Sequence, residues 1–220
     1  MAELLVVRPG PLTTVQDLGR RGVAHLGVPR AGALDEPALR AANRLVGNPP
    51  GTAALETTLG GVAVRALAPV LAAVTGAPAG VRVDGRPAAW GAAVAVPAGA
   101  VLEVGPASHG VRSYLAVAGG IAVPGVLGSR STDLLSGLGP APLAAGDRLP
   151  VGGAPVGPGA ALVPLPAPPA ELVLRLLPGP HADWWAAPGG RAPGRPPGGP
   201  AAPPRGPGPP GPPAGAPPPG

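Results

Sequence analysis

Residues 55–75, LETTLGGVAVRALAPVLAAVT, carry the strongest signal for the fold class. Apolar and polar residues alternate along 55–59, and Gly60-Gly61 then leads into a second alternating run over 62–67. Alternation on both sides of a glycine turn is typical of a β-hairpin. Residues 70–75 are more continuously apolar, which is typical of a strand buried on both faces. This stretch predicts a protein built mainly from β-strands.

The rest of the first 120 residues repeats this pattern of short strands and turns. Asp84-Gly85 follows a valine-rich run and is one of the strongest short hairpin signals, because both residues tolerate positive φ. Residues 93–96 and 101–104 are expected to pair around Pro97-Ala98-Gly99, and residues 112–118 alternate into Gly119-Gly120. About seven strands at this spacing predict a barrel or a sandwich.

One segment has the period of a helix instead. Asp35 is a suitable N-cap, and Pro37 lies in the first turn, where a missing N–H costs nothing. Apolar residues then recur at helical spacing up to Val46, before Gly47 and two prolines end the helix. We therefore expect one prominent helix over about residues 35–47 in an otherwise mainly β fold.

The composition divides the chain. Residues 186–220 contain 15 Pro, 10 Gly, 7 Ala and 3 Arg and nothing else, so this tail has no apolar side chain larger than Pro to bury in a core. We expect a first subdomain over 1–150, a linker with the start of an incomplete second subdomain over 151–185, and a disordered tail over 186–220. The four residue types of the tail have GC-rich codons, which suggests that it is the product of a frameshift.

Several classes of function are excluded by residues that are missing. The chain has no Lys and no Cys, which excludes Schiff-base catalysis, attached biotin and thiol chemistry. Its three His, at positions 25, 109 and 181, lack the spacing of a metal site. There is no basic stripe with aromatics for nucleic acid, and no 18-residue apolar run for a membrane. Residues 1–10 lack the features of a signal peptide, so we expect a cytoplasmic protein.

Polar residues gather next to glycines in two segments. Asp17 and Arg20 lie before a glycine-rich loop, and Asn43 and Asn48 lie on or just after the expected helix. Asp17 and Arg20 could form an ion pair, and Arg20-Arg21 could receive an anion. The alternative is that Asp17 fixes a turn by bonding its own backbone. Both interpretations stay open for Asp17, Arg20 and Asn43, whereas a role in the local structure is favoured for Asp35 and Asn48.

Six motifs together resemble one family. They are TTVQDLGR (13–20), RAGALD (30–35), ANRLVGNP (42–49), LETTLGG (55–61), RSYLAVAGG (112–120) and LGSRST (127–132). In this order they resemble the biotin-dependent carboxyltransferase A/B-subdomain family, also called allophanate hydrolase subunit 2, which includes KipA and the C subunit of 5-oxoprolinase. Shorter matches follow at AGD (145–147) and at LLPGP (176–180) with Asp183-Trp184. The resemblance therefore covers residues 3–185, and it implies a cyclophilin-like β-barrel. Family members continue into a second set of strands, where this chain changes at Ala186 into its tail.

The resemblance implies three possible functions. The first is the C subunit of an ATP-dependent hydrolase that opens 5-oxoproline to glutamate, together with a KipI-like subunit and a LamB/YcsF-type subunit. The second is a carboxyltransferase that moves CO2 from another protein's carboxybiotin to a urea-like acceptor. The third is a regulatory binding partner of the KipA type. ATP would act at the level of the complex, and this chain is expected to be inactive alone.

Both reactions pass through anionic intermediates, which arginine side chains and turn amides stabilise. The candidate catalytic residues are the polar groups inside the matching motifs, namely Asp17, Arg20, Asn43, Glu56 and Arg112. Arg20 and Arg112 are expected to neutralise developing negative charge. Glu56 lies on a strand opposite the apolar face, so the alternative for this residue is a simply solvated side chain. No cofactor-binding residue is identified.

Overall fold

The computed structural model describes residues 2–153, 162–165, 167, 171 and 173–175. Contacts divide the chain into two units, residues 1–168 and 169–220, and the fold described below belongs to the first unit. The predicted tail over 186–220 lies outside the described residues.

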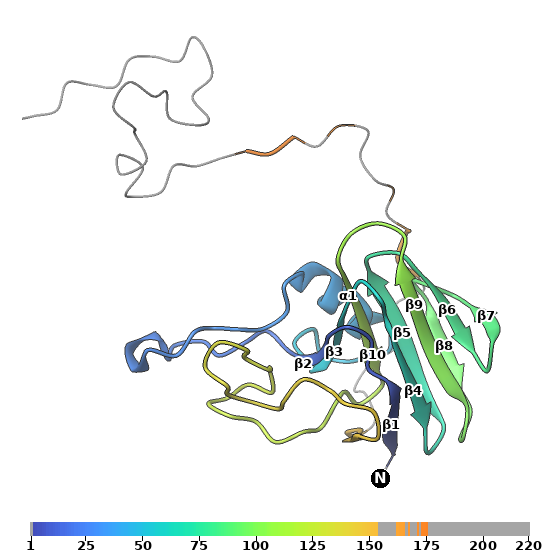
Figure 1. Cartoon of the computed structure of the whole chain (residues 1–220), viewed down its shortest axis with the longest axis horizontal. Coiled ribbons are helices and arrows are strands. Elements are labelled where there is room, and N and C mark those ends of the chain that lie inside the picture. Colours follow the sequence, from blue (N-terminus) through green and yellow to red (C-terminus); the bar gives the residue numbers. More distant parts are fainter. Residues whose placement is uncertain (1, 154–161, 166, 168–170, 172, 176–220) are drawn as a thin grey trace, which may run out of the picture. The chain divides into compact units, whose positions relative to one another are not determined.

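Eleven strands form two antiparallel sheets in the described residues (Figure 1). Sheet A has six strands in the order β11 (Arg148–Pro150), β1 (Glu3–Arg8), β4 (Val62–Ala66), β9 (Val101–Ala107), β6 (Ala79–Val83) and β7 (Arg86–Ala88). Sheet B has five, in the order β2 (Thr13–Gln16), β3 (Ala54–Thr58), β10 (Arg112–Val117), β5 (Val70–Gly76) and β8 (Ala93–Val96). The helices are α1 (Glu36–Leu45) and the short 3-10 helix η1 (Ala24–Leu26).

The predicted fold class is confirmed: the described chain is mainly β with one prominent helix. Its strands form two hydrogen-bonded sheets, and no strand pair in the described part of the chain joins one sheet to the other, so strand pairing does not close them into the expected barrel. Helix α1 starts and stops close to the predicted limits, because the Asp35 carboxylate accepts from the Ala38 amide at 3.0 Å and Val46 forms the C-cap.

Two predicted hairpins are wrong. β3 belongs to sheet B and β4 to sheet A, so Gly60-Gly61 carry the chain from one sheet to the other. Gly61 has φ of 73°, and a Cβ there would collide with the carbonyl oxygen of Val104. The pair over 93–96 and 101–104 fails in the same way, since β8 and β9 lie in different sheets. A turn signal alone does not distinguish a hairpin from a change of sheet.

The Asp84-Gly85 hairpin is confirmed. β6 and β7 pair directly across these two residues, which have φ of 48° and 76°. The expected burial of the strand over 70–75 is confirmed for the stretch from Ala72 to Thr75.

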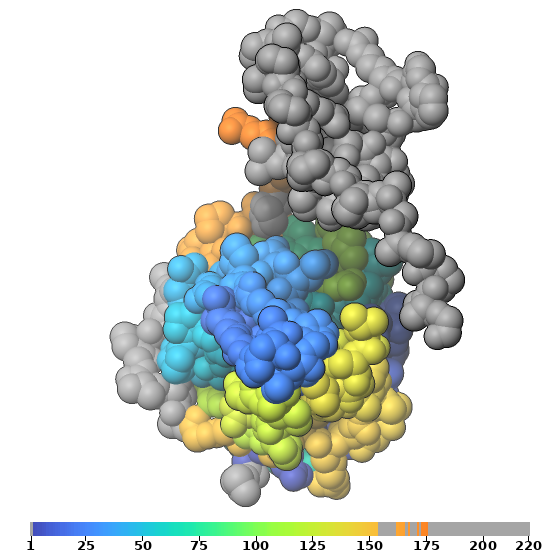
Figure 2. All heavy atoms as spheres, turned by 90° about the vertical axis from the view of Figure 1, so that its left-hand side faces the viewer, coloured from blue at the N-terminus to red at the C-terminus, as the bar shows by residue number. Residues whose placement is uncertain are grey.

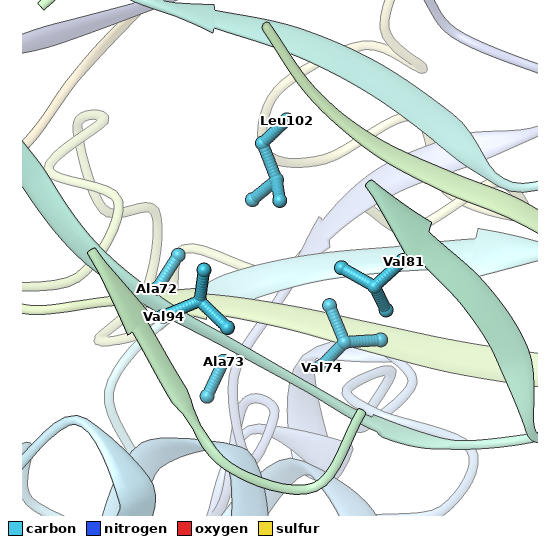
Figure 3. A pocket seen from close by; sticks show the side chains of 6 residues that line it. All are labelled: Ala72, Ala73, Val74, Val81, Val94 and Leu102. Atoms are coloured by element: carbon cyan, nitrogen blue, oxygen red, sulfur yellow. The ribbon is translucent and has the colours of Figure 1, made fainter. Parts of the chain in front are cut away.

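The core has two parts. The larger one fills the space between the sheets, and Figure 3 shows one region of it, where β5 and β8 face β6 and β9. Six aliphatic side chains line this region: Ala72, Ala73, Val74, Val81, Val94 and Leu102. The smaller part lies on the outer face of sheet B, where Leu39 and Leu45 of α1 pack with Tyr114 and Ala116. Among the described residues, no helix has the length and apolarity that a membrane crossing requires.

Candidate functional site

A row of buried polar side chains crosses the outer face of sheet B. Thr14, Glu56, Tyr114 and Thr75 lie directly opposite one another on four neighbouring strands, β2, β3, β10 and β5. None of the four is more than 8% exposed. Buried polar groups need hydrogen-bond partners. Thr14 accepts from Gln16 Nε2, and the other three residues find partners in residues 34–38, at the start of α1.

The polar row holds the start of α1. The Leu34 amide donates to Glu56 Oε2 at 2.9 Å, and the Asp35 amide donates to the Tyr114 hydroxyl at 2.7 Å. Tyr114 in turn donates to Glu56 Oε2 at 2.7 Å, and Thr75 Oγ1 donates to the Ala38 carbonyl. Burial, together with the neighbouring Glu56 carboxylate, raises the pKa of Tyr114, so its hydroxyl stays protonated and keeps donating.

Arg112, two residues before Tyr114 on β10, extends this network beside the row. Its Nε donates to Glu56 Oε1 at 3.1 Å, with side-chain exposures of 23% for Arg112 and 10% for Glu56. The terminal nitrogens of Arg112 have no hydrogen-bond partner among the described residues, so they retain the capacity to bind an anion. The alternative of a solvated Glu56 is wrong, because this carboxylate is buried and accepts three hydrogen bonds.

Asp17 lies in a separate polar cluster with the segment around residue 130. Its carboxylate accepts from the Gly19 amide, the Arg130 amide and the hydroxyls of Ser129 and Ser131, at 2.6–2.8 Å. Burial acts to raise the pKa of Asp17, but these hydrogen bonds outweigh it, so its pKa lies below the ordinary value. Asp17 is therefore a charged anchor at neutral pH, and its bond to Gly19 is the predicted turn.

Arg20 is 1% exposed and does not pair with Asp17 among the described residues, so the ion pair that the sequence left open does not form. Its Nε donates to the Val126 carbonyl at 3.1 Å, and its Nη2 donates to the Ser131 carbonyl at 2.6 Å. The other open possibility, that Arg20 and Arg21 together receive an anion, is not supported either. Arg21 is exposed and lies 3.9 Å from Glu36, whereas Arg20 is buried.

Three buried polar atoms near this cluster have no partner in the described residues. They belong to Gln16 (Oε1), Arg20 (Nη1) and Thr132 (Oγ1). Gln16 Nε2 donates to the Thr132 carbonyl, so these two residues are in contact. Neither Gln16 nor Tyr114 is among the residues predicted from the sequence. Tyr114 is the only tyrosine of the chain and lies in one of the matching motifs, and these two features could have identified it as a candidate site residue.

Asn43 lies at the opposite end of α1. Its Nδ2 donates to the Thr52 carbonyl, and its Oδ1 accepts from Asn48, which also bonds the backbones of Val117 and Gly119. The five candidate residues are thus in three places: Glu56 with Arg112, Asp17 near Arg20, and Asn43 with Asn48.

Solved structures contain the same arrangement of sheets. The protein TTHA0988 is 43% identical in sequence with a TM-score of 0.75, covering 82% of this chain and 37% of that one. The urea carboxylase of Kluyveromyces lactis is 35% identical with a TM-score of 0.65, covering 76% of this chain and 15% of that one. The two sheets and their covering helix therefore define a domain of the kind found in urea carboxylase.

The chain belongs to the family described as carboxyltransferase domain, subdomain A and B, whose model matches residues 26–191. It is similar to the C subunit of 5-oxoprolinase of Escherichia coli, with 48% identity over 152 residues, covering 68% of this chain and 49% of the relative. It is also similar to urea amidolyase of Saccharomyces cerevisiae, with 39% identity over 135 residues, covering 61% of this chain and 7% of the relative. The chain thus spans about half the length of the 5-oxoprolinase subunit that it matches.

Proposed function

We propose that this chain is a subunit of an ATP-dependent amide-ring hydrolase, equivalent to the C subunit of 5-oxoprolinase. The observation that carries the proposal is the 48% identity to the Escherichia coli protein of that name. In the proposed reaction, water opens the lactam C–N bond of 5-oxoproline, which yields the amine and the carboxylate of glutamate, while ATP is hydrolysed to ADP and phosphate. ATP is consumed at the level of the complex.

Arg112 is the candidate residue best placed to act on a reacting group. Its Nε is fixed by the Glu56 carboxylate, and its terminal nitrogens have no acceptor among the described residues. A guanidinium held in this way can neutralise the negative charge that develops on the lactam oxygen or on a transferred phosphoryl group. In this proposal Asp17, Arg20, Asn43 and Glu56 are positioning residues, since their contacts are with the protein itself.

The proposed complex contains a KipI-like subunit and a LamB/YcsF-type subunit. Two relatives are named as the C subunit of 5-oxoprolinase, which supports a protein that works with other chains. Because the chain has no Lys, it carries no biotin of its own. The second candidate function is carboxyl transfer from another protein's carboxybiotin to a urea-like acceptor, which the similarity to urea amidolyases favours.

Product analysis with two sets of substrates tests the assignment. The chain is combined with the KipI-like and LamB/YcsF-type proteins of its own genome and supplied with ATP and 5-oxoproline, or with carboxybiotin and urea. We expect glutamate from the first set and no carboxylated urea from the second. Carboxylated urea without glutamate would contradict the hydrolase assignment and favour carboxyl transfer.

A further inference from the structure

We propose that the loop of residues 18–34 is the element that docks this chain onto its KipI-like partner, through an acidic surface of the partner around an apolar recess. The inference rests on the proposed function for the identity of the partner. In Figure 1 this loop extends away from both sheets, with η1 at its tip. We call residues 18–34 the projecting loop.

The base of the projecting loop is rigidly held. The Arg20 amide donates to the Arg30 carbonyl at 2.7 Å, and the Ala33 amide donates to the Asp17 carbonyl at 2.9 Å. The two arms approach so closely that a Cβ on Gly19 would lie 2.5 Å from the Arg30 carbonyl oxygen. The buried Arg20 guanidinium also ties this base to the Val126 and Ser131 carbonyls.

The tip of the projecting loop, by contrast, buries nothing in the described structure. Helix η1 has no buried residue, and Leu26 is 58% exposed. Leu34, where the loop joins α1, is 71% exposed. A loop that is fixed at its base and apolar at its tip loses little conformational entropy on binding, so its apolar surface is available to stabilise a complex.

The charge of the loop selects the kind of partner. Arg21 and Arg30 of the loop and Arg40 of α1 all pair with one carboxylate, Glu36, so these four residues carry a net charge of about +2, which the adjacent exposed Asp35 lowers to about +1. Arginine is enriched in protein interfaces, where it meets acidic groups. Two copies of this chain would bring like charges together at a symmetric contact, so the charge favours an acidic partner over a second copy.

The neighbouring surface extends the proposed contact. Figure 2 faces the side from which the loop projects, and it shows the blue N-terminal segment beside the yellow-green to yellow segment that follows β10. The buried Arg20 guanidinium joins this segment to the base of the loop through the Val126 and Ser131 carbonyls. The docking surface therefore combines the loop leucines with the arginine group.

The test is the affinity of this chain for the KipI-like protein of its own genome, measured by isothermal titration calorimetry. Leu26→Asp and Arg30→Glu alter the projecting loop, while Leu67→Asp and Arg82→Glu make the same changes at exposed positions in or beside sheet A. We expect Kd to rise at least about tenfold for each loop variant and to change less than about twofold for each control. Unfolding curves check that all four variants fold, which is expected because the substituted side chains are exposed.

Three outcomes would overturn the inference. Loop variants that bind as tightly as the unaltered chain would show that the partner docks elsewhere, and would leave the proposed function standing. A complete lack of binding by the unaltered chain would contradict both the docking inference and the proposed complex. Self-association that the loop substitutions abolish would identify a second copy as the occupant.

Discussion

Glu56 joins three parts of the chain through a single carboxylate. Its two oxygens accept from the Leu34 amide, the Tyr114 hydroxyl and Arg112 Nε, so the start of α1, β10 and β3 are linked at one buried point. Removing a single donor from such a network leaves other buried groups without partners, and that makes the network sensitive to substitution.

Tyr114→Phe tests the strength of this link. The substitution removes the donor to Glu56 and leaves the Asp35 amide without its acceptor, so we expect a loss of about 1–3 kcal/mol in the free energy of unfolding. Urea denaturation measures the loss. Ser108→Ala, which removes a hydroxyl bond to the Pro78 carbonyl, is the control and should cost about 0.5–1 kcal/mol or less. Equal losses in the two variants would contradict the role given to the polar row.

Asp17 makes the stability of the fold depend on pH. Its pKa in the folded state lies below the ordinary value of 3.8, so the unfolded chain binds the proton more readily. The stabilisation is therefore present above the unfolded pKa and is lost as the pH falls through the folded pKa. We expect Asp17→Asn to lower stability at neutral pH and to flatten its decline as the pH falls below about 5. Urea denaturation across this range measures both effects, and parallel curves for the two proteins would contradict them.

The sequence motifs located the polar residues but did not identify their partners. Arg112 and Glu56 lie 56 residues apart and meet only because β10 and β3 are neighbours in sheet B. Asp17 bonds residues more than 110 positions away, for the same kind of reason. Spacing along the chain carries little information about such contacts, and it therefore left open an ion pair between Asp17 and Arg20 that the described structure does not contain.

At the scale of elements, local signals were reliable for single elements and unreliable for pairing. The cap of α1 and the Asp84-Gly85 turn depend on neighbouring residues, and both predictions are confirmed. The connection at Gly60-Gly61 depends on which sheet receives β4, and that choice is made by packing between the sheets. The residues of the turn therefore do not predict which sheet β4 joins.

Packing between the sheets gives the prediction at this scale. Leu102 of β9 is 2% exposed and lies in the aliphatic region of Figure 3, with Val74 of β5 and Val81 of β6. Leu102→Ala should cost about 2–5 kcal/mol, because it removes buried methyl groups and leaves a cavity. Leu71→Ala, at a position 37% exposed, should cost clearly less. Similar midpoints of urea denaturation for the two variants would contradict the position of the core.

At the scale of the whole molecule, the family is established, and the chain spans about half of its 5-oxoprolinase relative. The composition of residues 186–220 changes abruptly to Pro, Gly, Ala and Arg, and a frameshift remains our prediction for this tail. Translation of the DNA beyond codon 185 in the other two frames tests it. We expect one frame to restore alternating apolar and polar residues, and the absence of such a pattern in both frames would contradict the prediction.

We propose that this chain serves an ATP-dependent hydrolase of 5-oxoproline. The most direct measurement is the rate of glutamate formation from 5-oxoproline and ATP by the KipI-like and LamB/YcsF-type proteins, with and without this chain. We expect glutamate only when all three proteins and ATP are present, and none from this chain alone. An equal rate in the mixture that lacks the chain, or no glutamate from the complete mixture, would contradict the claim.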